Sequence, residues 1–122
     1  MTELTTAAAQ SYLILLHPEL VARDVALTIS DQVPTANVIM ARSPESAAQA
    51  LDAVTTVAVA FLAMEPDAYV KSQLAEAIRA RGGRAVLISD AAEAVGQGPD
   101  WIALARPFTT ECVVAVLALR AG

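Results

Sequence analysis

The sequence predicts an α/β domain in which a five-stranded parallel sheet carries helices on both faces. Short, wholly apolar runs recur along the chain, and segments with helical start and stop signals separate them. This strict alternation is typical of sheets built from strand–helix–strand units. With 122 residues, the chain has the size of one domain with a core of its own.

Five apolar runs predict the strands, and each is too short to form a core helix. Parallel strands are covered on both faces, so they read as continuous apolar runs instead of alternating ones. The run that begins at Val57 is the most typical of a strand. In chain order, the strands are expected over residues 12–16, 37–40, 57–63, 85–88 and 101–105.

Proline, glycine and threonine indicate where the intervening helices begin and end. Pro18 and Pro44 suit a first helical turn, because proline lacks only an amide that would be unpaired there. Gly82 is a left-handed helix stop, Gly96 limits the fourth helix, and Thr109 or Thr110 caps the last. Five helices are expected over residues 18–30, 44–53, 68–81, 89–95 and 109–119, the fourth being short.

Right-handed crossovers leave few topologies for such a chain, and the flavodoxin-like strand order 2-1-3-4-5 is the commonest doubly wound one at this length. We expect a single domain over residues 11–122. The polar residues 1–10 are expected to be a flexible N-terminal tail.

Composition excludes several classes of function. Hydrophobic residues make up 56% of the chain and charged residues 17%, which excludes disorder. The net charge is −5 and the basic residues are scattered, so we expect no nucleic-acid partner. The single cysteine, Cys112, has no partner for a disulfide or metal site and fits a cytoplasmic protein. No apolar run approaches the ~18 residues that span a bilayer, so we expect neither a membrane anchor nor a signal peptide.

Ligands of such sheets gather at the carboxyl ends of the strands. Chemistry-bearing residues are therefore sought where each predicted strand ends. Those positions hold His17-Pro18-Glu19, Ala63-Met64-Glu65, Ser89-Asp90 and Arg106-Pro107-Phe108.

In this order and spacing, the strand-end residues resemble those of a response-regulator receiver domain, and the resemblance covers residues 12–119. Receivers carry two acids after the first strand for Mg²⁺, a phospho-accepting aspartate after the third, a hydroxyl after the fourth and Lys-Pro-Phe after the fifth. The resemblance places Ser89 at the hydroxyl position and Arg106-Pro107-Phe108 at the Lys-Pro-Phe element. It places Ala63 at the acceptor position and His17-Pro18 at the acidic pair, so both acidic elements are lost.

The short fourth helix and the Arg-Pro-Phe element also resemble a shortened subclass of single-domain receivers from alphaproteobacteria. In that subclass, the motif after the fourth strand spells FATGUY, and residues 87–92 occupy its place here. Receivers signal partly through an aromatic residue on the fifth strand, and Ala103 stands at the corresponding position. The resemblance therefore implies an atypical receiver, or pseudo-receiver, of two-component signal transduction or a phosphorelay.

Accepting a phosphoryl group requires a carboxylate nucleophile and a hard cation held by oxygen ligands. Ala63 supplies no nucleophile. His17 is a poor Mg²⁺ ligand and Pro18 is none. We therefore expect a protein that is not phosphorylated, is not an enzyme and has no catalytic residue, metal or cofactor.

Two glutamates are expected near the same rim, and we expect one of them, Glu19 or Glu65, to pair with the guanidinium of Arg106. An alternative function is that the emptied pocket binds a small ligand, as a sensor or an enzyme. Arg106 would then favour an anion. The residues expected to line that pocket are His17, Glu19, Glu65, Ser89 and Arg106.

The first and last predicted helices carry more apolar residues than one buried stripe needs, and residues 112–119 include no polar side chain. These helices lie side by side in the flavodoxin-like topology, so an exposed patch on them would be a protein interface. We expect a homodimer, docking on a histidine kinase or regulator, or a place in a larger complex. The expected contact residues are Leu20, Val113, Val114 and Leu117.

Three residues have simpler structural interpretations. Ser89 is expected to cap the helix that follows it, Cys112 to be a small core residue, and Trp101 to pack in the core.

Overall fold

The computed structural model describes residues 10–106 and 109–121. Its elements in chain order are β1 (Ser11–Leu15), α1 (Glu19–Gln32), β2 (Asn37–Met40), α2 (Pro44–Leu51), β3 (Val57–Leu62), α3 (Pro66–Val70), α4 (Gln73–Ala80), β4 (Arg84–Leu87), α5 (Asp90–Val95), β5 (Trp101–Ala103) and α6 (Thr110–Ala121). The strands form one sheet in the order β2-β1-β3-β4-β5, and all neighbouring pairs are parallel. The predicted fold class and strand order are confirmed.

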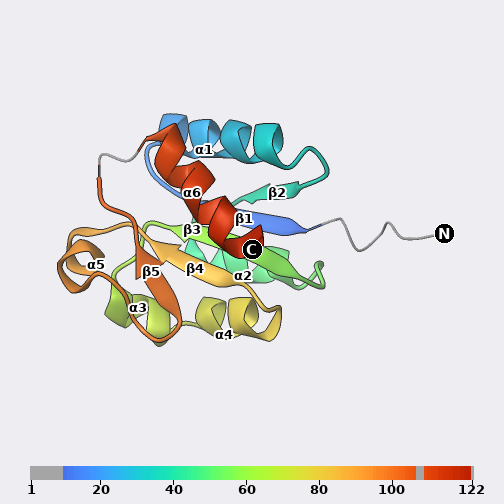
Figure 1. Cartoon of the computed structure of the whole chain (residues 1–122). Helices are drawn as coiled ribbons and strands as arrows, with labels where there is room; N and C mark the ends of the chain where they lie inside the picture. Colours follow the sequence, from blue (N-terminus) through green and yellow to red (C-terminus); the bar gives the residue numbers. More distant parts are fainter. Residues whose placement is uncertain (1–9, 107–108, 122) are drawn as a thin grey trace.

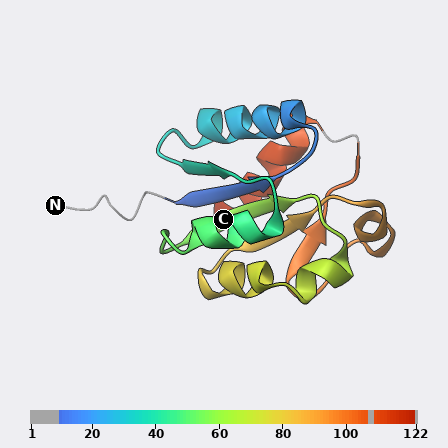
Figure 2. The same cartoon turned by 180° about the vertical axis from the view of Figure 1, so that it is seen from behind.

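The sheet has a helical layer on each face (Figures 1 and 2). Helices α1 and α6 cover one face, and α2, α3 and α4 cover the other, while α5 lies near the edge strand β5. Alternate residues of β1 point to opposite faces: Leu13 and Leu15 pack with the α2–α4 layer, whereas Tyr12 and Ile14 pack with α1 and α6. This two-sided burial explains why the strands read as continuous apolar runs.

The helix predicted over residues 68–81 is two helices, which raises the number among the described residues from the expected five to six. Ser72 separates them. Its hydroxyl oxygen accepts a hydrogen bond from the Ala75 N–H at 3.1 Å, which caps α4, and its hydroxyl group donates to the Tyr69 carbonyl at 2.6 Å. The local side-chain bonds of Ser72 thus replace helical ones between α3 and α4.

Other helix ends match the sequence signals closely. Ser43 and Ser46 form a reciprocal capping box at the start of α2, with Pro44 in its first turn. Helix α1 extends two residues past the expected end, to Gln32, and α2 ends at Leu51. Gly82, with φ +73°, adopts the left-handed conformation predicted for the stop after α4.

The expected flexible tail covers residues 1–10, of which 1–9 lie outside the described residues. Pro107 and Phe108 lie outside them as well. Within the part of the chain that is described, no helix has the length and apolar character needed to cross a membrane.

Candidate functional site

The carboxyl ends of the four strands that carry predicted site residues form one continuous rim. The backbone pairing continues past the strand ends: the Ala63 N–H donates to the Leu15 carbonyl at 2.7 Å, and the Ile88 N–H donates to the Leu62 carbonyl at 2.9 Å. Between β4 and β5, the Leu104 N–H donates to the Leu87 carbonyl at 3.2 Å. The strands therefore end in register, which places His17, Ala63, Ser89 and Arg106 along this rim.

A cavity of about 540 Å³ opens at this rim, between α1 and the first turn of α6. Four predicted site residues line it together: His17, Pro18, Ala63 and Arg106. This cavity therefore lies at the carboxyl edge of the sheet, where ligands of open α/β sheets bind.

Ala63, at the position that the resemblance assigns to a phosphoryl acceptor, is half-buried and contributes only a methyl group to the cavity. His17 and Pro18 stand beside it at the end of β1, and both are exposed. The described residues contain no group of three or more His, Cys, Asp or Glu side chains that is arranged to hold a metal ion. His17 and Pro18 supply no carboxylate, and Asp24 of α1 is the acid that lines the same cavity as Ala63.

The prediction that Arg106 pairs with Glu19 or Glu65 is wrong. Its guanidinium Nε donates to Glu93 Oε2 at 2.8 Å, its backbone N–H donates to the same oxygen at 3.2 Å, and a second guanidinium nitrogen pairs with Asp90. Both partners lie on α5, which follows the neighbouring strand, so they are nearer to Arg106 than residues after β1 or β3.

The two predicted glutamate partners have other positions. Glu19 forms an ion pair with Arg23, one turn along α1, at 2.9 Å, and it lines a different hollow with Met40 and Arg42. Glu65 is exposed at the start of α3. Neither belongs to the lining of the 540 Å³ cavity. Glu19 shares the other hollow with His17 at the carboxyl ends of β1 and β2, whereas Glu65 lines neither of these two hollows.

The ion pair shifts the titration of both partners. Hydrogen bonds from the Arg106 side chain and backbone lower the pKa of Glu93, and the hydrogen bond to Glu93 raises the pKa of Arg106. The guanidinium of Arg106, whose charge was expected to face the emptied pocket, thus forms ion pairs with the carboxylates of Asp90 and Glu93.

Glu93→Gln is expected to destabilise the protein at neutral pH and to have no effect in acid. Because the folded state lowers the pKa of Glu93, its ion pair stabilises the fold above the unfolded-state pKa, and this stabilisation is lost as the pH falls through the folded-state pKa. The difference in urea midpoint between the two proteins should therefore disappear between about pH 5 and about pH 3. Glu76→Gln, at an exposed position on α4, is the matched control. A difference that grows in acid would contradict this assignment.

Ser89 caps α5, as the sequence predicts, because its hydroxyl oxygen accepts a hydrogen bond from the Ala92 N–H at 3.1 Å. It does not belong to the cavity lining. Trp101 is buried in the core, also as predicted, whereas Cys112 is only partly buried, near the start of α6. A hydrogen bond from the Thr109 hydroxyl lowers the pKa of the Cys112 thiol.

The four expected interface residues divide into two groups. Leu20 is 70% exposed and Val114 is partly buried, so both reach the surface. Val113 and Leu117 are only 2% and 6% exposed, because they face the sheet and pack in the same cluster as Ile14. Those two residues are unavailable to a partner, which corrects the expectation that they form the contact.

Sequence reasoning missed the wall of the cavity that α1 provides. Val21, Asp24, Val25 and Thr28 all line it, and their spacing of three and four residues places them on one stripe of the helix. Asp24 and Thr28 interrupt this otherwise apolar stripe. These two polar residues, on the face of α1 that is directed at α6, are the feature of the sequence that could have indicated this wall of the cavity.

No family model matches the chain, and no curated protein matches it. Among solved structures, the chain is similar to a response regulator receiver protein from Sinorhizobium medicae WSM419, with a TM-score of 0.64. The two are 22% identical, and the match covers 92% of this chain and 97% of that one. The likeness establishes that this chain has the fold of a receiver protein.

Proposed function

We propose that this protein is an atypical receiver that does not accept a phosphoryl group and acts in signalling through contacts with other proteins. The observation that carries the proposal is the strand-end rim of a receiver-like fold with a methyl group, Ala63, at the acceptor position. An alanine side chain has no nucleophile, and phosphoryl transfer to the protein needs one.

The surroundings of Ala63 support the same conclusion. His17 and Pro18 stand where Mg²⁺ would need carboxylates, and Arg106 is already paired with Asp90 and Glu93. The guanidinium of Arg106 is therefore less able to neutralise the charge that develops on a transferring phosphoryl group. On this account, the protein is a cytoplasmic interaction module and not an enzyme.

A surface suited to protein contacts is present on α1. Leu20 and Leu27 are 70% and 64% exposed, and their seven-residue spacing places them on one face of the helix. Helix α6 packs beside α1 and exposes Ala115 and Ala118. Large apolar side chains repeated along one exposed helix face are typical of an interface. We propose that a second copy of the chain covers this face.

The double variant Leu20→Glu/Leu27→Glu is expected to convert a homodimer into a monomer, because it places charges in the apolar contact. Light scattering coupled to size exclusion should give twice the 12.7 kDa chain mass for the unaltered protein and the single chain mass for the variant. Val95→Glu, at a 63% exposed valine on α5, is the control that should stay dimeric. A monomeric unaltered protein would contradict the homodimer and leave a histidine kinase or regulator as the partner to test.

A further inference from the structure

The 540 Å³ cavity lies within the volume range of sites that bind small organic molecules. Its walls are largely apolar: Val21 and Val25 come from α1, Val113 from α6, and Ile88 and Ala63 from the strand ends. A site of this shape encloses a compact apolar body, and its few polar groups decide which ligand it prefers.

Two of the three threonine side chains in the lining, Thr28 and Thr109, already donate their hydroxyl hydrogens to other atoms of the protein. Thr28 donates its hydroxyl hydrogen to the Asp24 carbonyl at 3.0 Å. Thr109 donates its own to the Cys112 sulfur at 3.4 Å, and the Thr109 hydroxyl oxygen accepts from the Cys112 N–H at 3.3 Å. Neither side chain has its donor available for the carboxylate or phosphate of a ligand.

The charges around the cavity oppose an anionic ligand. Arg106 and His17 are the basic side chains of its lining, and both Glu93 and Asp90 pair with the guanidinium of Arg106. Asp24 also lines the cavity, and no described side chain forms an ion pair or hydrogen bond with its carboxylate. Three carboxylates thus stand against one guanidinium, which favours a positive charge in the cavity.

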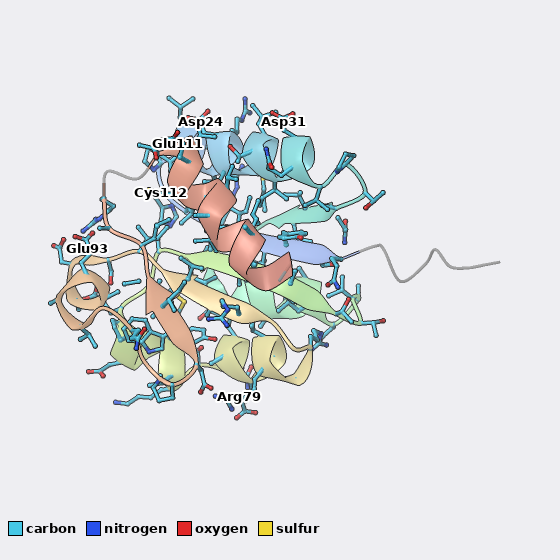
Figure 3. All side chains as sticks on the ribbon, viewed as in Figure 1. Asp24, Asp31, Arg79, Glu93, Glu111 and Cys112 are labelled. Atoms are coloured by element: carbon cyan, nitrogen blue, oxygen red, sulfur yellow. The ribbon has the colours of Figure 1, made fainter. Side chains whose placement is uncertain are left out.

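The Asp24 carboxylate is accessible from solvent at the end of the α1–α6 pair where α6 begins (Figure 3). Glu111, at the start of α6, lies at the same end, whereas Asp31 lies farther along α1 (Figure 3). A ligand whose apolar part enters between the two helices can therefore leave a cationic group at Asp24.

We infer that this cavity is a binding site for a small organic cation, an amine with a compact apolar or aromatic body. The ammonium group pairs with Asp24, and the apolar body lies against Val21 above Ala63, next to the first turn of α6. The site is the same rim that the proposed function describes, but the inference does not rest on that function. Amine binding is measured without a phosphodonor, so either proposal can fail while the other stands.

The test uses two probes of similar size and opposite charge, phenethylamine and 3-phenylpropanoate, titrated into the labelled protein and followed by amide chemical shifts. The amine is expected to give saturable shifts at Val25, Ala63 and Val113, with a Kd on the order of 1 mM for so small a probe. The Kd of the carboxylate is expected to be at least about fivefold higher than that of the amine. Equal or tighter binding of the carboxylate, shifts confined to other regions, or no binding of the amine would each overturn the inference.

Matched variants separate the charge of the site from its shape. Asp24→Asn is expected to remove the preference for the amine, whereas Asp31→Asn, at an exposed acid of the same helix, is expected to keep it. Ala63→Leu is expected to fill the floor of the cavity and weaken both probes together. Circular dichroism checks that each variant is folded. Loss of the preference in Asp31→Asn, or its retention in Asp24→Asn, would contradict the assigned role of Asp24.

Discussion

Leu117→Glu is expected to leave most of the molecules unfolded. It is not expected to give folded monomers, as a substitution in a dimer contact would. Leu117 lies in an apolar cluster between α6 and the sheet. A carboxylate buried there costs several kcal/mol because it loses its hydration and gains no partner in the cluster. The lost burial of leucine adds about 1.5–3 kcal/mol. Together these costs approach the total stability of a domain, about 5–15 kcal/mol.

Far-UV circular dichroism and urea denaturation measure this effect directly. Val95→Glu is the matched control, because a carboxylate at an exposed position outside the proposed dimer contact should change the free energy of unfolding by no more than about 0.5 kcal/mol. If Leu117→Glu were as stable as Val95→Glu, α6 would pack on the sheet differently from the arrangement described.

Ala63→Asp is expected not to make the protein a phosphoryl acceptor, although it restores a carboxylate at the acceptor position. The new carboxylate would have no acidic neighbour at His17 or Pro18 with which to hold Mg²⁺. It would also add negative charge to a rim where Arg106 is already neutralised, which disfavours the approach of an anionic phosphodonor. Intact-protein mass spectrometry after incubation with Mg²⁺ and acetyl phosphate should therefore show no stoichiometric adduct.

Ala63→Asn controls for modification elsewhere on the chain, because the amide has the shape of the carboxylate without its nucleophilic oxygen. An adduct present in Ala63→Asp and absent from Ala63→Asn would show that the rim still supports phosphoryl transfer. The loss of function would then lie in one residue, and the wider change at His17, Pro18 and Arg106 would have a different explanation.

The strands were predictable because burial on both faces makes each strand apolar throughout. Their order was predictable because right-handed crossovers leave few topologies. Runs such as Val57–Leu62 are apolar throughout, and proline or glycine follows most of them closely. The division between α3 and α4 was harder to predict, since Ser72 lies inside a helical pattern and competes with it only through its local hydrogen bonds.

The strand ends contain one of the two partners of Arg106, Asp90, but not the other, Glu93. The sequence reasoning considered acids directly after β1 and β3, but the nearest carboxylates belong to α5, including Glu93 one turn inside it. The position of the short helix α5 beside the end of β5 decides this pair, and the order of the residues does not show that position.

The wholly apolar run on α6 predicted an interface but could not say which of its residues form one. When every position is apolar, the sequence lacks the polar stripe that normally identifies the exposed face. Packing against α1 and the sheet buries Val113 and Leu117 and leaves Ala115 and Ala118 at the surface. The exposed leucines of α1 are therefore the better indication of a contact.

Whether this receiver-like fold accepts a phosphoryl group is measured on the unaltered protein with Mg²⁺ and beryllofluoride, a mimic of a bound phosphoryl group. Amide spectra are recorded through the titration, with attention to His17, Ala63 and Ser89 along the strand-end rim. Because Ala63 has no carboxylate to bind beryllofluoride, these signals are expected to stay unchanged at saturating reagent. Saturable shifts at the rim, or a stoichiometric beryllofluoride adduct, would contradict it.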